Sequence, residues 1–254
     1  MTDPSPEQVA AFYDQFARYE LRHAFNERQL LLFQKLRALG LSPHSRVLEL
    51  GCGIGLITSL MARVVGPAGT IEAVDISPES IALARRQLRG RPQVRFTVSD
   101  LLTYTPASTG YDFVTLFDVL EHIPLDQHAA LFARVAPCLA DHSRLVLHIP
   151  HPANIHYLRL HAPHTLQVID QPVEVIPLLS AASSAGLELI EYTTHSIWQP
   201  ADYQWLILRR RQPFLPHAID QRRGLLDKIR HRLSLRLQRW RWAPHLTIHR
   251  PDAP

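Results

Sequence analysis

The fold of this chain follows from one stretch, Val47-Leu48-Glu49-Leu50-Gly51-Cys52-Gly53-Ile54-Gly55. Apolar residues around one acidic side chain lead into three glycines at alternate positions, and an apolar helical pattern follows from Leu56 to Val65. Glycine is needed where a backbone turns tightly and comes close to a ligand, because a Cβ would occupy the ligand's place. The stretch predicts a strand, a tight turn and a helix, with a ligand beside the turn.

Short β-rich segments and helical segments alternate along the chain. We expect strands at Arg46 to Leu50, Thr70 to Val74, Val94 to Val98, Phe113 to Phe117 and Leu145 to Ile149. We expect helices at Leu56 to Val65, Pro78 to Arg89 and Gln127 to Leu139, with one or two more within residues 5–39. This alternation predicts a doubly wound α/β fold with a parallel sheet.

Beyond Pro150 the sequence changes character. A Pro- and His-rich connection reaches about Gln171, and a helix is expected from Val173 to Ala185. Two final strands, Leu187 to Ile197 and Tyr203 to Leu208, are close enough in sequence to pair as an antiparallel hairpin.

The spacing of the glycines distinguishes two kinds of cofactor site. Dinucleotide sites carry Gly-x-Gly-x-x-Gly, whereas here the spacing is Gly-x-Gly-x-Gly and Glu49 stands two positions before the first glycine. This pattern resembles the E/D-x-G-x-G-x-G motif of the class I S-adenosyl-L-methionine (SAM) dependent methyltransferases, and the resemblance covers roughly residues 40–210. It implies SAM as the cofactor. It also implies a seven-stranded, mostly parallel sheet with an antiparallel last strand and helices on both faces.

The resemblance assigns further residues to the cofactor. Asp75 corresponds to the acidic residue that accepts hydrogen bonds from both ribose hydroxyls, a role that suits the forked acceptor oxygens of a carboxylate. Asp100 would meet the adenine amino group, with Ile76 and Leu101 on either side of the ring, while Phe117 and Asp118 would lie near the methionine moiety. The expected cofactor-binding set is Tyr13, Glu49, Gly51, Cys52, Gly53, Gly55, Asp75, Ile76, Asp100, Leu101, Phe117 and Asp118.

Two histidines are candidate bases. His122 lies in a stretch from Asp118 to Pro124 that resembles the D-V-L-E-H-I/V segment of small-molecule methyltransferases, where the histidine faces the acceptor pocket in several branches. Imidazole titrates near neutral pH, so His122 is the first candidate; packing beside the following helix is the alternative interpretation. His151 follows the fifth strand at the sheet edge where ligands bind in open α/β folds, and is the second candidate. His148 is expected within the strand.

Six histidines fall between residues 142 and 164, which raises the question of a metal site. Their spacing matches no compact metal motif, and metal-dependent methyltransferases of this fold use mainly carboxylates. We expect no metal.

The N-terminal segment from Phe12 to Tyr19 is similar to the Y-D-x-x-A helix of relatives in which the tyrosine closes over the cofactor. Tyr13 is therefore expected to be a lid residue, and an aromatic core stripe is the alternative. The predicted organisation is an N-terminal helical lid over residues 1–40, a SAM-binding domain over 41–211 and a basic extension over 212–254.

Charge is distributed unevenly along the chain. Residues 209–254 hold twelve Lys and Arg against three Asp, whereas the chain as a whole has a net charge of only +4. Apolar residues between Leu226 and Trp240 recur at steps of three and four, so Ala218 to Trp242 reads as a basic amphipathic helix. It could pack on the catalytic domain, rest on an anionic membrane or bind nucleic acid, the last being the least favoured.

The composition suits a cytoplasmic protein. The first residues lack the basic and apolar regions of a signal peptide, and no stretch approaches the roughly 18 apolar residues of a spanning helix. Only two cysteines occur, which suits a reducing compartment. We expect a cytoplasmic protein, peripheral on the membrane if the basic helix binds lipid, and the oligomeric state stays open.

The expected function is SAM-dependent methylation of a small molecule or biosynthetic intermediate, with oxygen as the favoured acceptor atom. The chain lacks the Asn/Asp-Pro-Pro-Tyr/Phe motif that would indicate amino groups of nucleobases or glutamine. One alternative is a lipid-linked or glycan substrate at the membrane surface. Another is a SAM-binding protein without catalysis.

Overall fold

The computed structural model describes residues 5–22, 26–213, 230, 232–234 and 236–237. The chain divides into two compact units, Met1–Arg211 and Gln212–Pro254. Most of the expected basic helix from Ala218 to Trp242 lies outside the described residues, although those described within it, such as Arg232 and Leu233, are helical.

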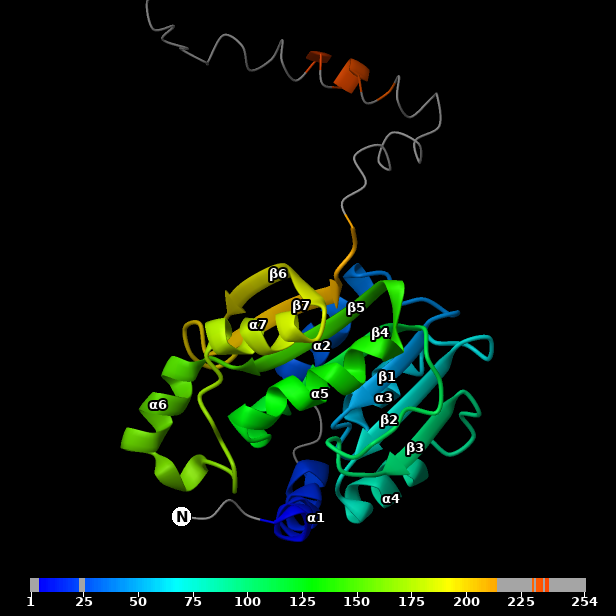
Figure 1. Cartoon of the computed structure of the whole chain (residues 1–254). Coiled ribbons are helices and arrows are strands. Elements are labelled where there is room, and N and C mark those ends of the chain that lie inside the picture. The colour runs from blue at the N-terminus through cyan, green and yellow to red at the C-terminus, as the bar shows by residue number, and fades with distance from the viewer. Residues whose placement is uncertain (1–4, 23–25, 214–229, 231, 235, 238–254) are drawn as a thin grey trace, which may run out of the picture. The chain divides into compact units, whose positions relative to one another are not determined.

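The first unit is a seven-stranded sheet with helices on both faces (Figure 1). Its strands are β1 (Arg46–Leu50), β2 (Thr70–Asp75), β3 (Val94–Val98), β4 (Tyr111–Phe117), β5 (Leu139–Pro150), β6 (Leu187–His195) and β7 (Tyr203–Arg210). The helices are α1 (Pro6–Arg22), α2 (Glu27–Ala38), α3 (Leu56–Met61), α4 (Pro78–Gln87), α5 (His128–Val135), α6 (Pro152–His161) and α7 (Val175–Ser184). Short 3₁₀ turns are η1 (Leu120–His122), η2 (Leu125–Gln127), η3 (Ala136–Cys138) and η4 (Pro163–Thr165).

The strand order is β3-β2-β1-β4-β5-β7-β6. β1 pairs in parallel with β2 and β4, and β7 runs antiparallel to both of its neighbours, β5 and β6. The doubly wound, mostly parallel sheet with an antiparallel last strand is therefore confirmed. The order reverses between β1 and β4, which is where ligands bind in open α/β sheets.

Two apolar layers cover the sheet. On one face, Leu32 and Leu36 of α2 and Met61 of α3 pack against Val47 and Trp205. On the other face, a larger cluster joins the apolar side of α5 and α7 to the strands, with Phe132, Leu178, Leu116 and Leu206 among its fully buried members. Successive residues of β1 pack in opposite layers: Val47 lies in the first and Leu48 in the second.

The connection after β5 differs from expectation, because it contains helix α6. Pro152 occupies the first turn of this helix, where its missing N–H is not needed, and the His151 side chain accepts a hydrogen bond from Ala153 N. Pro152, which contributes to the Pro-rich composition of this connection, thus marks the start of a helix.

Candidate active site

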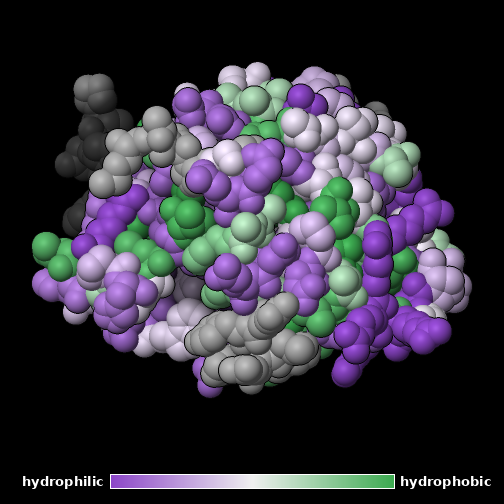
Figure 2. All heavy atoms as spheres, turned by 90° about the horizontal axis from the view of Figure 1, so that it is seen from below, coloured by the Kyte–Doolittle hydropathy of each residue, from purple (hydrophilic) through white to green (hydrophobic). Residues whose placement is uncertain are grey.

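A pocket of about 360 Å³ lies at the carboxyl ends of the parallel strands. Its floor comes from the turns after β1, β2, β3 and β4, and α1 and α2 contribute Tyr13 and Arg28 to its wall. Figure 2 views the molecule from the side on which α1 lies, and on this face apolar patches interrupt a largely hydrophilic surface. Eleven of the twelve expected cofactor-binding residues line this pocket, Gly55 being the exception.

The glycine turn is fixed to the end of β2. The amides of Gly51 and Cys52 both donate to Val74 O, at 2.8 and 2.9 Å, and Gly53 N donates to Asp75 Oδ2 at 2.7 Å. Gly51 has φ +78°, and a Cβ at this position would collide with the side chain of Val119. The turn therefore requires glycine for its backbone conformation and for its close approach to the segment after β4.

Gly55 stands apart from the other residues of the expected cofactor-binding set. It lies outside the pocket lining, at the start of α3 with φ +82°, and a Cβ there would lie 3.0 Å from Ala84 Cβ. Its missing side chain lets α3 approach α4. The third glycine of the motif thus serves helix packing in this structure.

Backbone amides hold both carboxylate oxygens of Asp75 at the end of β2. Its Oδ1 accepts from Ser77 N at 2.9 Å, while Oδ2 accepts from Gly53 N. Burial raises the pKa of Asp75, the backbone donors oppose this shift, and the nearby carboxylate of Asp14 adds to it. A carboxylate offers about four acceptor sites, so beside the backbone donors of Gly53, Ile76 and Ser77 it keeps acceptor capacity for a ligand.

Glu49 is buried beneath the turn. Its Oε2 accepts a hydrogen bond from Thr58 Oγ1 at 2.5 Å, and only 3% of the residue is exposed. Burial raises the pKa of Glu49 to about 8. At neutral pH this side chain is therefore mainly protonated, and it can donate a hydrogen bond as well as accept one.

The loop after β3 supplies Asp100 and Leu101. Asp100 Oδ1 accepts from Leu102 N at 2.9 Å, which closes a local turn and fixes the carboxylate beside the pocket. Leu101 and Ile76 both line the pocket. This arrangement offers apolar walls with an acceptor at one edge, as a planar heterocycle with an amino group requires.

Asp118 connects the pocket to α2. It has φ +55°, which is uncommon for a residue other than glycine. Its carboxylate forms an ion pair with Arg28 and lies 3.1 Å from His148 Nδ1. Burial alone would raise its pKa, but Arg28 and His148 outweigh burial and hold the pKa of Asp118 below its usual range.

His122 lines the pocket between two carboxylates. Its Nδ1 lies 2.5 Å from Ile169 O and 3.2 Å from Asp170 Oδ1, and its Nε2 lies 3.9 Å from Glu121 Oε1. A carbonyl oxygen can only accept, so Nδ1 carries a hydrogen and Nε2 is the nitrogen left to exchange a proton. Burial would lower the pKa of His122, but the two carboxylates outweigh burial and raise it to about 9.

The second candidate base lies elsewhere. His151 does not line the pocket, and its Nδ1 accepts from Ala153 N at 3.2 Å at the start of α6. His148 lies within β5 as expected, fully buried, with its ring stacked 4.4 Å from that of Tyr203. Within the described residues, no group of three or more His, Cys, Asp or Glu side chains is arranged to hold a metal ion.

Tyr13 lines the pocket from α1, and its ring lies 5.8 Å from that of His122. The next residue, Asp14, has a role that the sequence did not reveal. Its Oδ1 accepts from Ser77 Oγ at 2.5 Å and from Glu79 N at 3.1 Å, at the start of α4. The Y-D pair in the sequence was the available signal, because an acidic side chain suits a helix N-terminus.

Comparisons with known proteins agree with this geometry. A family model described as a methyltransferase domain matches residues 13–206. The chain therefore belongs to this family of methyltransferase domains.

Curated relatives match parts of the chain. A ubiquinone biosynthesis O-methyltransferase of Xanthomonas campestris pv. campestris is 38% identical over 86 residues, which cover 32% of this chain and 34% of the relative. A trans-aconitate 2-methyltransferase of Variovorax paradoxus is 31% identical over 135 residues, covering 53% of this chain and 48% of the relative. The chain thus matches about a third of the first relative's length and about half of the second's.

Solved structures share the fold. A TehB-like SAM-dependent methyltransferase from Corynebacterium glutamicum superposes with a TM-score of 0.59 at 16% identity, covering 80% of this chain and 98% of that one. Magnesium protoporphyrin IX methyltransferase from Synechocystis, solved with bound SAM, gives a TM-score of 0.56 at 20% identity, covering 77% and 84%.

Proposed function

We propose that this chain binds SAM in the pocket and transfers its methyl group to an oxygen atom of a small-molecule acceptor. The observation that carries the proposal is that the cofactor-motif residues and His122 line the same pocket. The relatives named above, an O-methyltransferase and a trans-aconitate methyltransferase, support a small-molecule acceptor.

The residues of the pocket fit the chemistry of SAM. Asp75 offers a fixed acceptor fork for two vicinal hydroxyls. Asp100, with Ile76 and Leu101, suits an adenine ring and its amino group. The turn at Gly51 and Gly53 lines the pocket, and the mainly protonated Glu49 beneath it can donate a hydrogen bond to a carboxylate.

Catalysis in this pocket requires alignment and the removal of a proton. When bound, SAM supplies an electrophilic methyl group on a positively charged sulfur. Alignment of the acceptor can contribute on the order of 7–11 kcal/mol, and a base about 10²–10⁴ in rate. His122 accepts the acceptor's proton at Nε2, because Nδ1 is held by the Ile169 carbonyl.

The raised pKa of His122 has a consequence for the pH profile. The imidazolium form predominates below about pH 9, and that form cannot accept a proton. The rate with a hydroxyl acceptor is therefore expected to rise with pH until about pH 9. A base with this pKa matches phenols, whose pKa is close to the value of about 10 for tyrosine, better than aliphatic alcohols.

Two probe acceptors separate the base role from general damage. Catechol must lose a proton when it is methylated, whereas trans-aconitate offers carboxylates that are already ionised. His122→Gln should lower turnover of catechol by about 10²–10⁴ and leave turnover of trans-aconitate within a few-fold. Equal losses with both acceptors, or no loss with catechol, would remove His122 as the base.

A further inference from the structure

A short segment holds His122 from one side. We call residues 167–171 the strap. Gln171 N donates to Glu121 O at 2.9 Å, and Gln171 Nε2 donates to Ile123 O at 3.2 Å, so the strap is tied to both sides of His122. The strap follows α6 and η4 in the chain and contributes Gln167 and Ile169 to the pocket lining.

Asp170 is fixed within the strap at two of its oxygen atoms. Its Oδ2 accepts from Gln167 N at 2.6 Å, and its backbone carbonyl accepts from Arg159 Nη2 at 2.6 Å. Its remaining oxygen, Oδ1, lies 3.2 Å from His122 Nδ1, and each of the two side chains is only 10% exposed. The carboxylate is therefore held toward the imidazole and away from bulk water.

We propose that Asp170 is the positioning residue of His122: its carboxylate fixes the imidazole with Nδ1–H toward the strap and stabilises the protonated ring that forms when Nε2 accepts a proton. The catalytic part of this proposal rests on the proposed function, whereas the structural part, the control of the state of His122, does not. A carboxylate–histidine pair acts in this way in other enzymes, where it orients the ring and balances its charge without itself taking the proton.

The other charged and titratable groups near His122 leave this role to Asp170. Glu121 also raises the pKa of His122 through its charge, but its Oε1 lies 3.9 Å from Nε2, beyond hydrogen-bond distance, and it is near the nitrogen that exchanges the proton, not near Nδ1. Asp118 interacts with His122 at longer range and is paired with Arg28. The rings of Tyr13 and His122 form an edge-type contact, with 5.8 Å between their centroids.

The reaction balances with Asp170 as a bystander to bond formation. The acceptor oxygen forms the new bond to carbon, the electron pair of the sulfur–carbon bond stays on sulfur, and the acceptor's proton moves to His122 Nε2. Asp170 remains ionised throughout. Its hydrogen bond to Nδ1–H strengthens as the ring becomes positive, which lowers the energy of the product side.

The test is a direct titration of His122 by NMR in the full-length protein without ligands. Nitrogen-15 imidazole shifts report the charge of each histidine, and His122→Gln assigns the signal. Asp170→Asn keeps an oxygen for Gln167 N while removing the charge. An opposite charge at this distance shifts a pKa by about 1–3, so Asp170→Asn should lower the pKa of His122 by about 1 or more.

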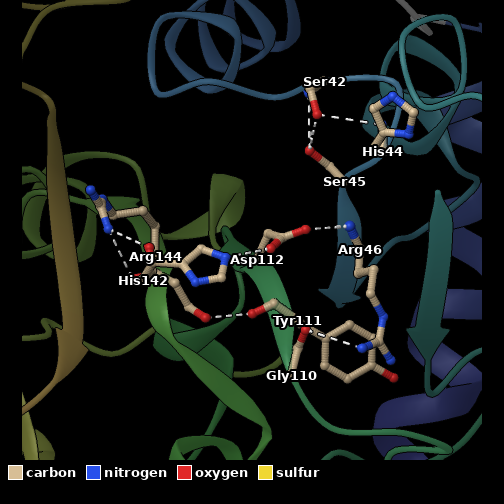
Figure 3. A network of polar contacts seen from close by, with 10 residues as sticks. Ser42, His44, Ser45, Arg46, Gly110, Tyr111, Asp112, His142 and Arg144 are labelled. Carbon is tan, nitrogen blue, oxygen red and sulfur yellow. Dashed lines mark hydrogen bonds and ion pairs between the residues drawn. The ribbon is translucent and has the colours of Figure 1, made fainter. Parts of the chain in front are cut away.

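A matched control is available at the other end of the sheet. Asp112 Oδ1 lies 2.8 Å from His142 Nε2, and Oδ2 accepts from Arg46 N at 2.8 Å (Figure 3). Asp112→Asn therefore removes a carboxylate from another histidine contact, and neither Asp112 nor His142 lines the pocket. It should leave the pKa of His122 unchanged.

A conservative variant separates charge from disruption of the strap. Asp170→Glu keeps the charge and should keep the raised pKa of His122. An unchanged pKa in Asp170→Asn would overturn the proposal. A lowered pKa in both Asp170→Asn and Asp170→Glu would also overturn it, because loss of the strap, and not of the charge, would then be the cause.

Activity adds a separate readout. With catechol as the acceptor, Asp170→Asn should lower the plateau of kcat above about pH 9 by about tenfold or more and shift the rising limb of the pH profile to lower pH, with the KM for SAM unchanged. If the wild-type protein methylates neither catechol nor trans-aconitate while the NMR shift appears, the proposed function with these acceptors fails and the control of His122 by Asp170 stands.

Discussion

Three ionisable side chains in or next to the pocket have pKa values above their ordinary range. Glu49, Glu121 and His122 are all buried, and burial or neighbouring charges raise their pKa values to about 8, 8 and 9. At neutral pH Glu49 is therefore mainly neutral and His122 mainly charged, and the charged imidazole opposes the effect of burial on Glu121. The proposed proton transfer from the acceptor to His122 depends on this balance.

Substitution of Gly51 should lower the free energy of unfolding. Gly51→Ala places a residue with a Cβ at φ +78° and against the side chain of Val119. The conformational strain costs about 1–2 kcal/mol and the overpacking about 1–3 kcal/mol, so the free energy of unfolding should fall by about 2–5 kcal/mol. Urea denaturation measures this loss.

Gly90 provides the control. It has φ +85°, but a Cβ there would meet nothing within 4 Å. Gly90→Ala should therefore cost only the conformational term, about 1–2 kcal/mol. Equal losses for Gly51→Ala and Gly90→Ala would show that contact with Val119 does not restrict this turn.

At the scale of elements, α1 is attached to α4 through one carboxylate. Asp14 accepts hydrogen bonds from Ser77 Oγ and Glu79 N, which places Tyr13 at the pocket. Asp14→Ala should loosen α1 and lower SAM affinity by about five- to tenfold, since a hydrogen bond is worth about 1 kcal/mol. Calorimetric titration with SAM measures the change.

Gln15 is exposed on the same helix and provides a matched substitution. Gln15→Ala should leave SAM affinity within twofold. Unchanged affinity in Asp14→Ala would mean that α1 does not act as a lid and that Tyr13 belongs to the aromatic packing with Phe12 and Phe16.

Periodicity in the sequence was sufficient to predict the strands. Arg46–Leu50 and Val94–Val98 match their expected bounds, because each is a short β-rich run between turn residues. β5 begins earlier than expected, at Leu139, since its polar first half pairs at only one point with β4, Tyr111 with Leu139, before a register shift. Helix α6 was missed because its apolar residues do not share one buried face: Ile155 is buried, whereas Tyr157 and Leu160 are exposed.

The residues of the candidate site differ in how far the sequence could predict their positions. Asp75 and Asp100 each lie at or just after the end of a strand, so the order of the motifs places them at one edge of the sheet. Other contacts at the pocket join distant segments: Asp170 is 48 positions from His122 in the chain, and Arg28 is 90 positions from Asp118. No local pattern encodes such pairs, and only tertiary packing brings them together.

At the scale of the whole molecule, the basic extension over residues 212–254 needs a role of its own. None of the described helices is long and apolar enough to cross a membrane. We propose that the extension binds anionic lipid surfaces, because its positive charge and its apolar residues at helical spacing suit an interfacial helix.

Vesicle sedimentation tests this proposal. Each basic residue near an anionic surface contributes about 1 kcal/mol, so the full chain should partition onto phosphatidylserine-containing vesicles at least tenfold more than residues 1–211. Neutral phosphatidylcholine vesicles serve as the control and should show little difference between the two proteins. Equal partitioning of both proteins onto the anionic vesicles would count against a lipid role.

We propose that the pocket at the glycine turn is the SAM site. Calorimetric titration of SAM into the wild-type protein and into Asp75→Ala tests it most directly, with circular dichroism to establish that both are folded. Hydrogen bonds to a charged group are worth about 1.5–3 kcal/mol each, so loss of the carboxylate should weaken SAM binding by about thirtyfold or more. Folded wild-type protein that binds no SAM, or an Asp75→Ala variant with unchanged affinity, would contradict this account.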